Sequence, residues 1–186
     1  MKLLVYGSSE FGVVVRNMVT ACGHEFAGFV DDVHPQNEGV IGAFESARIT
    51  HDPKEFGIVL AVGYKHLEAR RRIFEKVRGC GYVLPALIHP AAYVCEPPHV
   101  GEGSLIMARA IVDCHARIGV ACVIWPGANV SHNSTIGANT FLSPNCTVCG
   151  FVTIGQGTFV GAGAVIADKR SVPEASFIKA GSVFSY

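Results

Sequence analysis

Three of the eight histidines, His99, His115 and His132, lie in the C-terminal half of the 186-residue chain and could support chemistry there. A neutral imidazole can accept a proton near pH 7 or bind a zinc ion. Zinc requires ligands that converge at about 2.0 Å, and these histidines form no H-x-x-x-x-H pair. We therefore expect no metal site, and proton transfer remains as the chemistry that a histidine would supply.

A second candidate is the run GSSEFG at residues 7–12, which follows an apolar segment, residues 2–7. Glycines let a backbone approach phosphate groups, and the free N–H groups of a helix start attract anions. Spacing alone leaves two interpretations open. The run is either a phosphate-binding turn or only a tight connection between a strand and a helix.

The seven cysteines are scattered and odd in number, which favours reduced thiols in a cytoplasmic protein. Cys146 and Cys149 form a single C-x-x-C pair, which could act in redox chemistry or bind a metal. Cys146 occupies a position that small residues fill elsewhere in the same region. A structural role is therefore the favoured interpretation.

The C-terminal half has an aliphatic residue at every sixth position, which no helix or ordinary sheet requires. A chain wound into a three-sided coil does require it, because each short side points one aliphatic residue inward. Glycine follows the aliphatic residue at Gly101, Gly119, Gly137 and Gly155, once per coil, which predicts a corner with positive φ. The aliphatic positions are Ile88, Val94, Val100, Ile106, Val112, Ile118, Ile124, Val130, Ile136, Leu142, Val148, Ile154, Val160 and Ile166.

The N-terminal half alternates strand-like and helix-like segments, which predicts a small parallel sheet with helical crossovers. Loops are expected from Pro35 to Phe56. The predicted strands are residues 2–7, 25–30 and 58–62, and the predicted helices are residues 11–22 and 66–78. We thus expect an α/β domain over residues 1–85, the coil over 86–170, and a capping tail over 171–186.

The charge pattern narrows the possible partners. The formal net charge is zero and there is no basic stripe, so we expect no nucleic-acid partner. No apolar run reaches the roughly 18 residues of a membrane helix, so no membrane insertion is expected. The N-terminus becomes glycine-rich too early for a signal peptide, which favours a cytoplasmic location.

Taken together, the hexapeptide repeat and the short α/β domain before it resemble the left-handed β-helix acyltransferases. The N-terminal part resembles their NeuD/PglD-type branch, the sugar O- and N-acyltransferases of bacterial surface-glycan pathways. The resemblance implies a Rossmann-like domain followed by a left-handed parallel β-helix. It also implies acetyl-CoA-dependent acetylation of an amino or hydroxy group on a nucleotide-activated sugar. The enzyme would be a homotrimer with sites at its subunit interfaces.

The resemblance also assigns roles to residues of both halves. His132, before the Thr135-Ile136-Gly137 corner, would be the general base beside Asn133, and the Gly150 N–H would hold the thioester oxygen. Gly150, Ala162 and Gly163 would contact acetyl-CoA. The nucleotide-sugar would contact Gly7, Ser8, Ser9, Gly12, Asp31, Asp32, Gly63, Tyr64 and Lys65.

Several positions depart from the family's pattern. Glu10 replaces the middle glycine of the first turn, and Asn133 replaces the acidic residue that orients the histidine. Trp125 and Phe141 replace a family asparagine and a second histidine, and residues 179–183 also differ. One coil separates His115 from Asn133, so we hypothesise that His115 helps to orient His132 or the acceptor.

Two other functions fit the same scaffold. The departures from the family's pattern leave open a nucleotide-sugar-binding trimer that performs no acyl transfer. A carbonic anhydrase of the β-helix type is the other, but the spread of the histidines over separate coils disfavours it.

Overall fold

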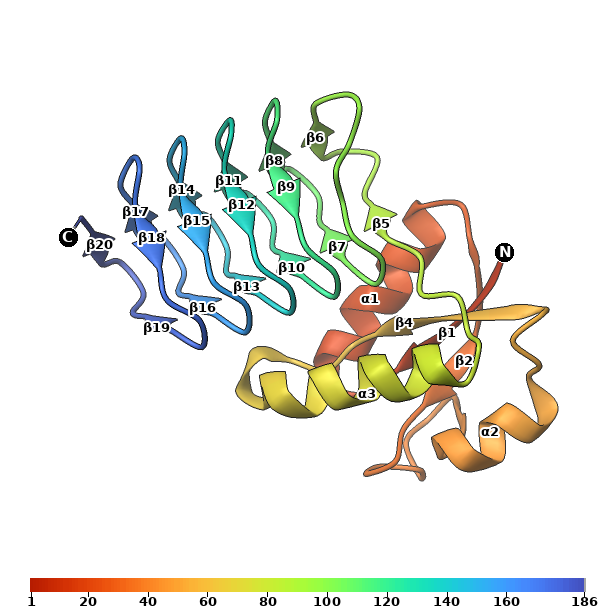
Figure 1. Cartoon of the computed structure of the whole chain (residues 1–186). Helices are drawn as coiled ribbons and strands as arrows, with labels where there is room; N and C mark the ends of the chain where they lie inside the picture. The colour runs from red at the N-terminus through yellow and green to blue at the C-terminus, as the bar shows by residue number, and fades with distance from the viewer. Residues whose placement is uncertain (186) are drawn as a thin grey trace. The chain divides into compact units, whose positions relative to one another are not determined.

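The computed structural model describes residues 1–185, and the chain divides into two compact units. The first is Met1–Pro85 and the second begins at Ala86. Figure 1 shows an α/β unit in the N-terminal colours and a coil of short strands in the C-terminal colours. The two parts of the predicted fold class are therefore both present.

The first unit contains a four-stranded parallel sheet in the order β3-β2-β1-β4. Its core includes Leu3, Leu4 and Val5 of β1, which have no exposed surface. The predicted strands and helices are found, with the last strand two residues earlier than expected. The elements are β1 (Lys2–Tyr6), α1 (Glu10–Ala21), β2 (Glu25–Val30), β3 (Val40–Gly42), α2 (Phe44–Thr50), β4 (Phe56–Leu60), η1 (Tyr64–His66) and α3 (Leu67–Gly79).

The expectation of loops from Pro35 to Phe56 is wrong, because this segment contains β3 and α2. The edge strand β3 pairs with β2, which supplies its hydrogen bonds. Helix α2 begins at Phe44, whose ring is 1% exposed and stacks on Tyr6 at 5.7 Å between centroids. A single buried aromatic side chain thus anchors a helix too short and too polar to be seen from its periodicity.

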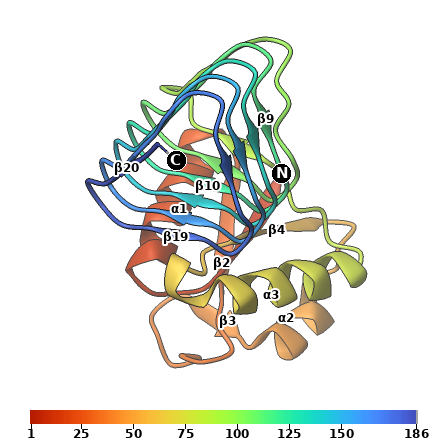
Figure 2. The same cartoon turned by 60° about the vertical axis from the view of Figure 1, so that its left-hand side comes forward.

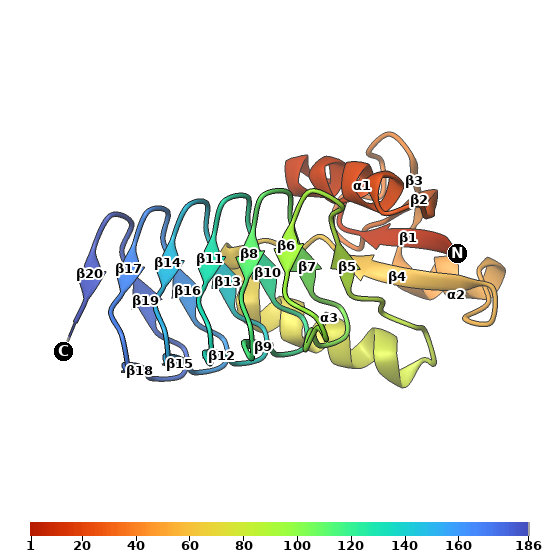
Figure 3. The ribbon, with the colours of Figure 1, turned by 90° about the horizontal axis from the view of Figure 1, so that it is seen from above.

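The second unit is a parallel β-helix in which strands of one coil pair with those of the next (Figures 2 and 3). The β5 sheet contains β5 (Leu87–Ile88), β7 (Leu105–Ile106), β10 (Val123–Ile124), β13 (Phe141–Leu142), β16 (Phe159–Val160) and β19 (Phe177–Ile178). The β6 sheet contains β6 (Tyr93–Val94), β8 (Ile111–Val112), β11 (Asn129–Val130), β14 (Thr147–Val148), β17 (Val165–Ile166) and β20 (Val183–Phe184). The β9 sheet contains β9 (Arg117–Ile118), β12 (Thr135–Ile136), β15 (Thr153–Ile154) and β18 (Ser171–Val172). The sixth-position aliphatic residues fill the interior of the coil, as predicted.

The prediction that the glycine found once per coil has positive φ is wrong. Gly101, Gly119, Gly137 and Gly155 do not have positive φ. They are small because a Cβ at Gly137, for example, would lie 2.5 Å from the backbone nitrogen of Gln156 on the next coil. The left-handed conformation instead recurs two residues later, at Gly103, Ala121, Asn139 and Gly157.

The last segment of the chain is also different from its prediction. Residues 171–186 were expected to form a capping tail, and Tyr186 lies outside the described residues. Strands β18, β19 and β20 instead continue the three sheets, with Val172 and Ile178 buried in the same register. The six-residue period therefore continues beyond Ile166.

The cysteines are not all reduced, because Cys95 and Cys114 form a disulfide. Cys146 has no exposed surface, and burial raises the pKa of its thiol to about 12. A thiol so rarely ionised is a poor nucleophile and metal ligand, which agrees with a structural role for this residue. In the part of the chain that the structure describes, no cluster of His, Cys, Asp or Glu could hold a metal ion. Among these residues there is also no helix long and apolar enough to cross a membrane.

Candidate active site

In the first unit, the strands β1, β2 and β4 end at the same edge of the sheet. Tyr6 pairs with Val30 on one side and with Leu60 on the other, so the residues that follow these strands lie close together. Carboxyl ends of parallel strands are the usual binding edge in α/β units. Gly7 and Asp31 are thereby brought to one place, and their contact with a nucleotide-sugar stays a prediction.

Gly7 and Gly12 both lie where another part of the backbone comes too close for a side chain. Gly7 has φ 113°, and a Cβ there would lie 2.7 Å from the Ala61 carbonyl oxygen. A Cβ on Gly12 would lie 2.3 Å from the Gly7 carbonyl oxygen. The first turn of α1 is thus pressed onto the end of β1, which explains both glycines without a ligand.

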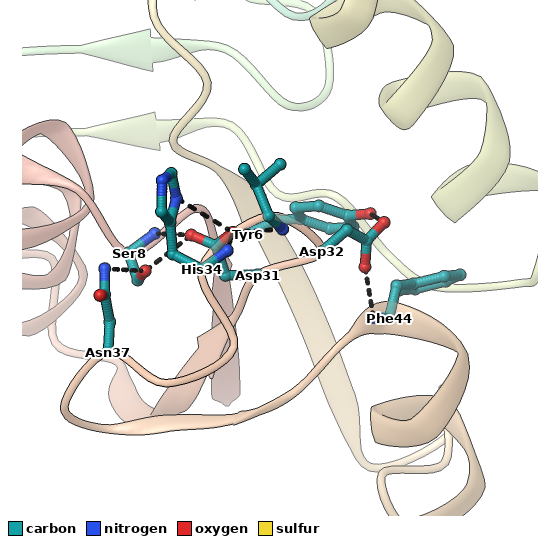
Figure 4. Close-up of polar contacts among 8 residues, drawn as sticks. Tyr6, Ser8, Asp31, Asp32, His34, Asn37 and Phe44 are labelled. Atoms are coloured by element: carbon teal, nitrogen blue, oxygen red, sulfur yellow. Dashed lines mark hydrogen bonds and ion pairs between the residues drawn. The ribbon is translucent and has the colours of Figure 1, made fainter.

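Asp31 holds this turn together from inside the protein (Figure 4). Its Oδ2 accepts hydrogen bonds from the Ser8 N–H and hydroxyl at 2.9 and 2.6 Å. Its Oδ1 accepts the N–H groups of Val33 and His34 at 2.9 and 2.8 Å. Burial by itself would raise the pKa of Asp31, but these hydrogen bonds outweigh it and lower the pKa below its ordinary value.

The carboxylate of Asp32 also accepts hydrogen bonds from its own unit. It accepts the hydroxyl hydrogen of Tyr6 on Oδ2 and the Phe44 N–H on Oδ1 at 2.7 Å. Burial, followed by the nearby carboxylate of Asp32, raises the pKa of Tyr6, so the phenol stays a donor. Both predicted substrate-binding carboxylates therefore organise the loop after β2, and Asp32 remains exposed.

Sequence reasoning missed two polar residues of this loop. Asn37 donates its side-chain N–H to the Ser8 hydroxyl at 2.9 Å. His34 places Nδ1 3.8 Å from Asp31 and is half exposed. Asn37 lies in the segment that was expected to form loops and His34 lies directly before it, so their contacts depend on how this part of the chain folds.

The third predicted contact, Gly63-Tyr64-Lys65, forms the start of η1 just after β4. Tyr64 and Lys65 are exposed. The turn is anchored by Arg70 of α3, which has no exposed surface and donates to the carbonyl oxygens of Leu60 and Val62 at 3.1 and 3.3 Å. A charged side chain is seldom fully buried, so this role of Arg70 could not be read from the sequence.

In the second unit, His132 lies at a corner that follows β11. Its Nδ1 lies 3.1 Å from Oδ1 of Asn133, and its ring makes an edge-to-face contact with Phe151 at 5.2 Å between centroids. Asn133 has φ 59°, a conformation that asparagine tolerates well. An Nδ1–H donated to this oxygen leaves Nε2 without a proton, ready to accept one.

Gly150 lies one coil beyond His132, and its missing side chain leaves room for the imidazole. A Cβ on Gly150 would lie 3.0 Å from Cε1 and 3.1 Å from Nε2 of His132. Within residues 1–185, the Gly150 N–H donates no hydrogen bond. His132 and Gly150, predicted as base and oxyanion donor, are therefore neighbours in one chain.

Sequence reasoning also missed Asp168, which lies one coil beyond Gly150. The same hypothetical Cβ on Gly150 would lie 3.5 Å from Oδ1 of Asp168. The pKa of Cys149 is raised by burial and then by the negative charge of Asp168, so this carboxylate faces the corner. The coil spacing that linked His132 to Gly150 would have found Asp168 if extended by one more coil.

The remaining predicted residues are not gathered at this corner. Ala162 and Gly163 follow β16 of the β5 sheet, which is another corner of the coil. Trp125 and Phe141 contact each other, with 5.9 Å between ring centroids. Among the described residues, His115 makes no hydrogen bond to Asn133 or His132, and the hypothesis that it helps to orient His132 or the acceptor stays a prediction.

Comparison with protein families agrees with this architecture. Residues 2–77 match the PglD N-terminal domain, and residues 133–168 match the bacterial transferase hexapeptide, six repeats. The two matches lie in separate units of the structure, one in each.

Solved structures are similar over the whole chain. The acetyltransferase domain of PglB from Neisseria gonorrhoeae is 30% identical, with a TM-score of 0.88 over 99% of this chain and 91% of that one. It has also been solved with acetyl coenzyme A. PerB from Caulobacter crescentus, solved with CoA and GDP-perosamine, is 27% identical, with a TM-score of 0.92 over 100% of this chain and 89% of that one. The chain belongs to the hexapeptide-repeat sugar acetyltransferases that carry a PglD-type N-terminal domain.

Proposed function

We propose that this protein transfers an acetyl group from acetyl-CoA to an amino or hydroxy group of a nucleotide-activated sugar. The observation that carries the proposal is the arrangement of His132, Asn133 and Gly150. A histidine whose Nδ1 is held by Asn133 has its Nε2 directed at a glycine whose N–H is free of hydrogen bonds within the described chain. Complexes of similar acetyltransferases with acetyl coenzyme A, or with CoA and GDP-perosamine, support the two substrates.

The chemistry follows from these groups. Nε2 of His132 takes a proton from the acceptor as that atom bonds to the thioester carbonyl carbon. The Gly150 N–H donates to the oxygen that becomes negative, a contribution of about 3 kcal/mol where such a donor is well placed. The carbon–sulfur bond then breaks, and the imidazolium returns the proton to the departing thiolate. Asn133 keeps the tautomer but adds no charge to stabilise the imidazolium.

The proposal also includes the binding of the nucleotide-sugar. Gly7, Ser8, Ser9 and Gly12 would approach the phosphates, and Tyr64 with Lys65 would contact the sugar nucleotide. Asp31 and Asp32 would act mainly by shaping the loop, since their oxygens already accept hydrogen bonds. We further propose a cytoplasmic homotrimer, in which Ala162 and Gly163 of an adjacent subunit contact acetyl-CoA. The product would enter the synthesis of a bacterial surface glycan.

The test is release of free thiol from acetyl-CoA with UDP-, GDP- and dTDP-linked amino sugars as acceptors. Release by the wild type with one acceptor, reduced by about 100-fold or more in His132→Ala, is expected. The absence of release with every acceptor, in a folded protein that binds a nucleotide-sugar, would contradict acyl transfer. That result would favour a protein that only binds the nucleotide-sugar.

A further inference from the structure

The space beside Gly150 is faced by two side chains that come from different coils. The position that a Cβ of residue 150 would occupy lies 3.1 Å from Nε2 of His132 and 3.5 Å from Oδ1 of Asp168. The absence of a side chain at Gly150 keeps this position free. One atom of a substrate placed just outside it would be near hydrogen-bonding distance of both groups.

On the basis of the proposed function, we propose that Asp168 is a second catalytic residue, that it contacts the acceptor atom, and that this atom is an amine nitrogen. A neutral sugar amine has two hydrogens, one for Nε2 of His132 and one for the carboxylate of Asp168. As its nitrogen bonds to the thioester carbon it becomes positively charged, and the carboxylate stabilises this charge. His132 takes one proton from this nitrogen and gives it to the thiolate that leaves when the carbon–sulfur bond breaks.

A hydroxyl acceptor would gain less from the same arrangement. Its proton leaves as the oxygen attacks, so no positive charge develops beside the carboxylate. A carboxylate next to an oxygen that is becoming negative is instead unfavourable. The position of Asp168 therefore selects an amino sugar over its hydroxy counterpart.

The other charged groups near this corner do not replace Asp168. Asp113 accepts the N–H of Cys114 at 2.7 Å and lies in the neighbouring column of the coil, and Cys114 is bonded to Cys95. Lys169 follows Asp168 directly in the chain and donates its backbone N–H to Gly150 at 3.0 Å. Asp168 is exposed, so exchanging its carboxylate for an amide does not disturb the core.

The test compares the wild type, Asp168→Asn, Asp168→Glu and His132→Ala with a nucleotide-linked amino sugar and its hydroxy counterpart. Glu174→Gln is the matched control, because Glu174 is also an exposed carboxylate of the coil and pairs only with Gln156 among the described residues. We expect Asp168→Asn to lower kcat/KM for the amino sugar by roughly 10- to 100-fold. The KM for acetyl-CoA and the melting temperature should stay unchanged, and Asp168→Glu should retain part of the activity.

Different results would separate this inference from the proposed function. An active wild type, an inactive His132→Ala and a fully active Asp168→Asn would overturn the role of Asp168 and leave the proposed function intact. Equal use of the hydroxy sugar would overturn the preference for an amine. A wild type that releases no thiol with any acceptor would overturn the proposed function, and the inference with it.

Discussion

Nδ1 of His132 lies 3.1 Å from the side-chain oxygen of Asn133, the next residue in the chain. The contact is possible because Asn133 occupies the left-handed conformation, which turns its side chain toward the preceding residue at the corner. A neutral amide here fixes the tautomer of the imidazole but does not balance a positive charge on it. Asn133 therefore orients the candidate base and, being neutral, also leaves the positive charge of the protonated imidazole without a balancing carboxylate.

Substitutions of Asn133 test this relationship. Asn133→Gly keeps the positive φ without strain and removes the oxygen, so we expect kcat to fall by roughly tenfold or more with little change in stability. Asn133→Asp adds a charge that stabilises the imidazolium, and we expect kcat to rise above that of the wild type. Steady-state kinetics at saturating acetyl-CoA measures both effects. Unchanged kcat in Asn133→Gly would show that the contact does not orient the base.

Gly12 can be tested for its packing against Gly7. A Cβ at this position would lie 2.3 Å from a backbone oxygen, so Gly12→Ala must displace α1 from the end of β1. We expect the free energy of unfolding to fall by about 1–3 kcal/mol. Gly79→Ala is the matched control, since nothing lies within 4 Å of its Cβ position and alanine favours the helix. Chemical denaturation that ranks Gly12→Ala with the control would contradict the close approach.

The glycine found once per coil can be tested in a similar way, although here the close approach is to the next coil. Gly137→Ala would place a Cβ 2.5 Å from the backbone of the next coil, and we expect a loss of stability of about 1–3 kcal/mol. Gly157 has φ 65° and open space around it, so Gly157→Asn should be tolerated. Thermal melting of the two variants distinguishes a need for stacking room from a need for positive φ. Equal destabilisation of both would refute this distinction.

The disulfide between Cys95 and Cys114 can be checked by counting thiols. Alkylation of the unfolded protein without reductant should label five cysteines, namely Cys22, Cys80, Cys122, Cys146 and Cys149. Reduction before alkylation should add two labels, which mass spectrometry of peptides would assign to Cys95 and Cys114. Seven labels without reductant would show that the protein carries only reduced thiols.

The fold was largely predictable because its signals are local and repeated. The six-residue period requires only the sequence positions of residues such as Ile136 and Ile154, and their burial follows from the coil. Helix α2 was missed because its formation depends on Phe44, a single residue that contacts Tyr6 from a distant part of the chain. The period gave no sign of why Gly137 is a glycine, since that depends on the distance between coils.

The candidate site was predictable where the coil spacing applies. His132 and Gly150 are one coil apart and were expected to be neighbours. Asp168 was missed because the family's pattern offered no role for it, although its position follows from the same spacing. Sequence pattern identified Asp31 but not the four donors that bind its carboxylate, because three of them come from backbone N–H groups placed by the folded loop.

The same four hydrogen bonds make Asp31 a source of pH-dependent stability. They hold the pKa of Asp31 in the folded protein below its ordinary value of about 3.9. The stabilisation is therefore complete above the pKa of the unfolded chain, and it is lost as the pH falls through the lower pKa of the folded protein. We expect Asp31→Asn to cost about 1–3 kcal/mol near neutral pH, and the difference from the wild type to shrink in acid.

Urea denaturation of the wild type and Asp31→Asn over a series of pH values from neutral to acid measures this dependence. Glu55→Gln is the control, because Glu55 is an exposed carboxyl group of the same unit, and its difference from the wild type should stay small at every pH. A stability difference for Asp31→Asn that stays constant into acid would mean that the donors bind the protonated group equally well. The geometry of the hydrogen bonds would then hold the loop after β2, and the negative charge of Asp31 would contribute nothing to the stability of this loop.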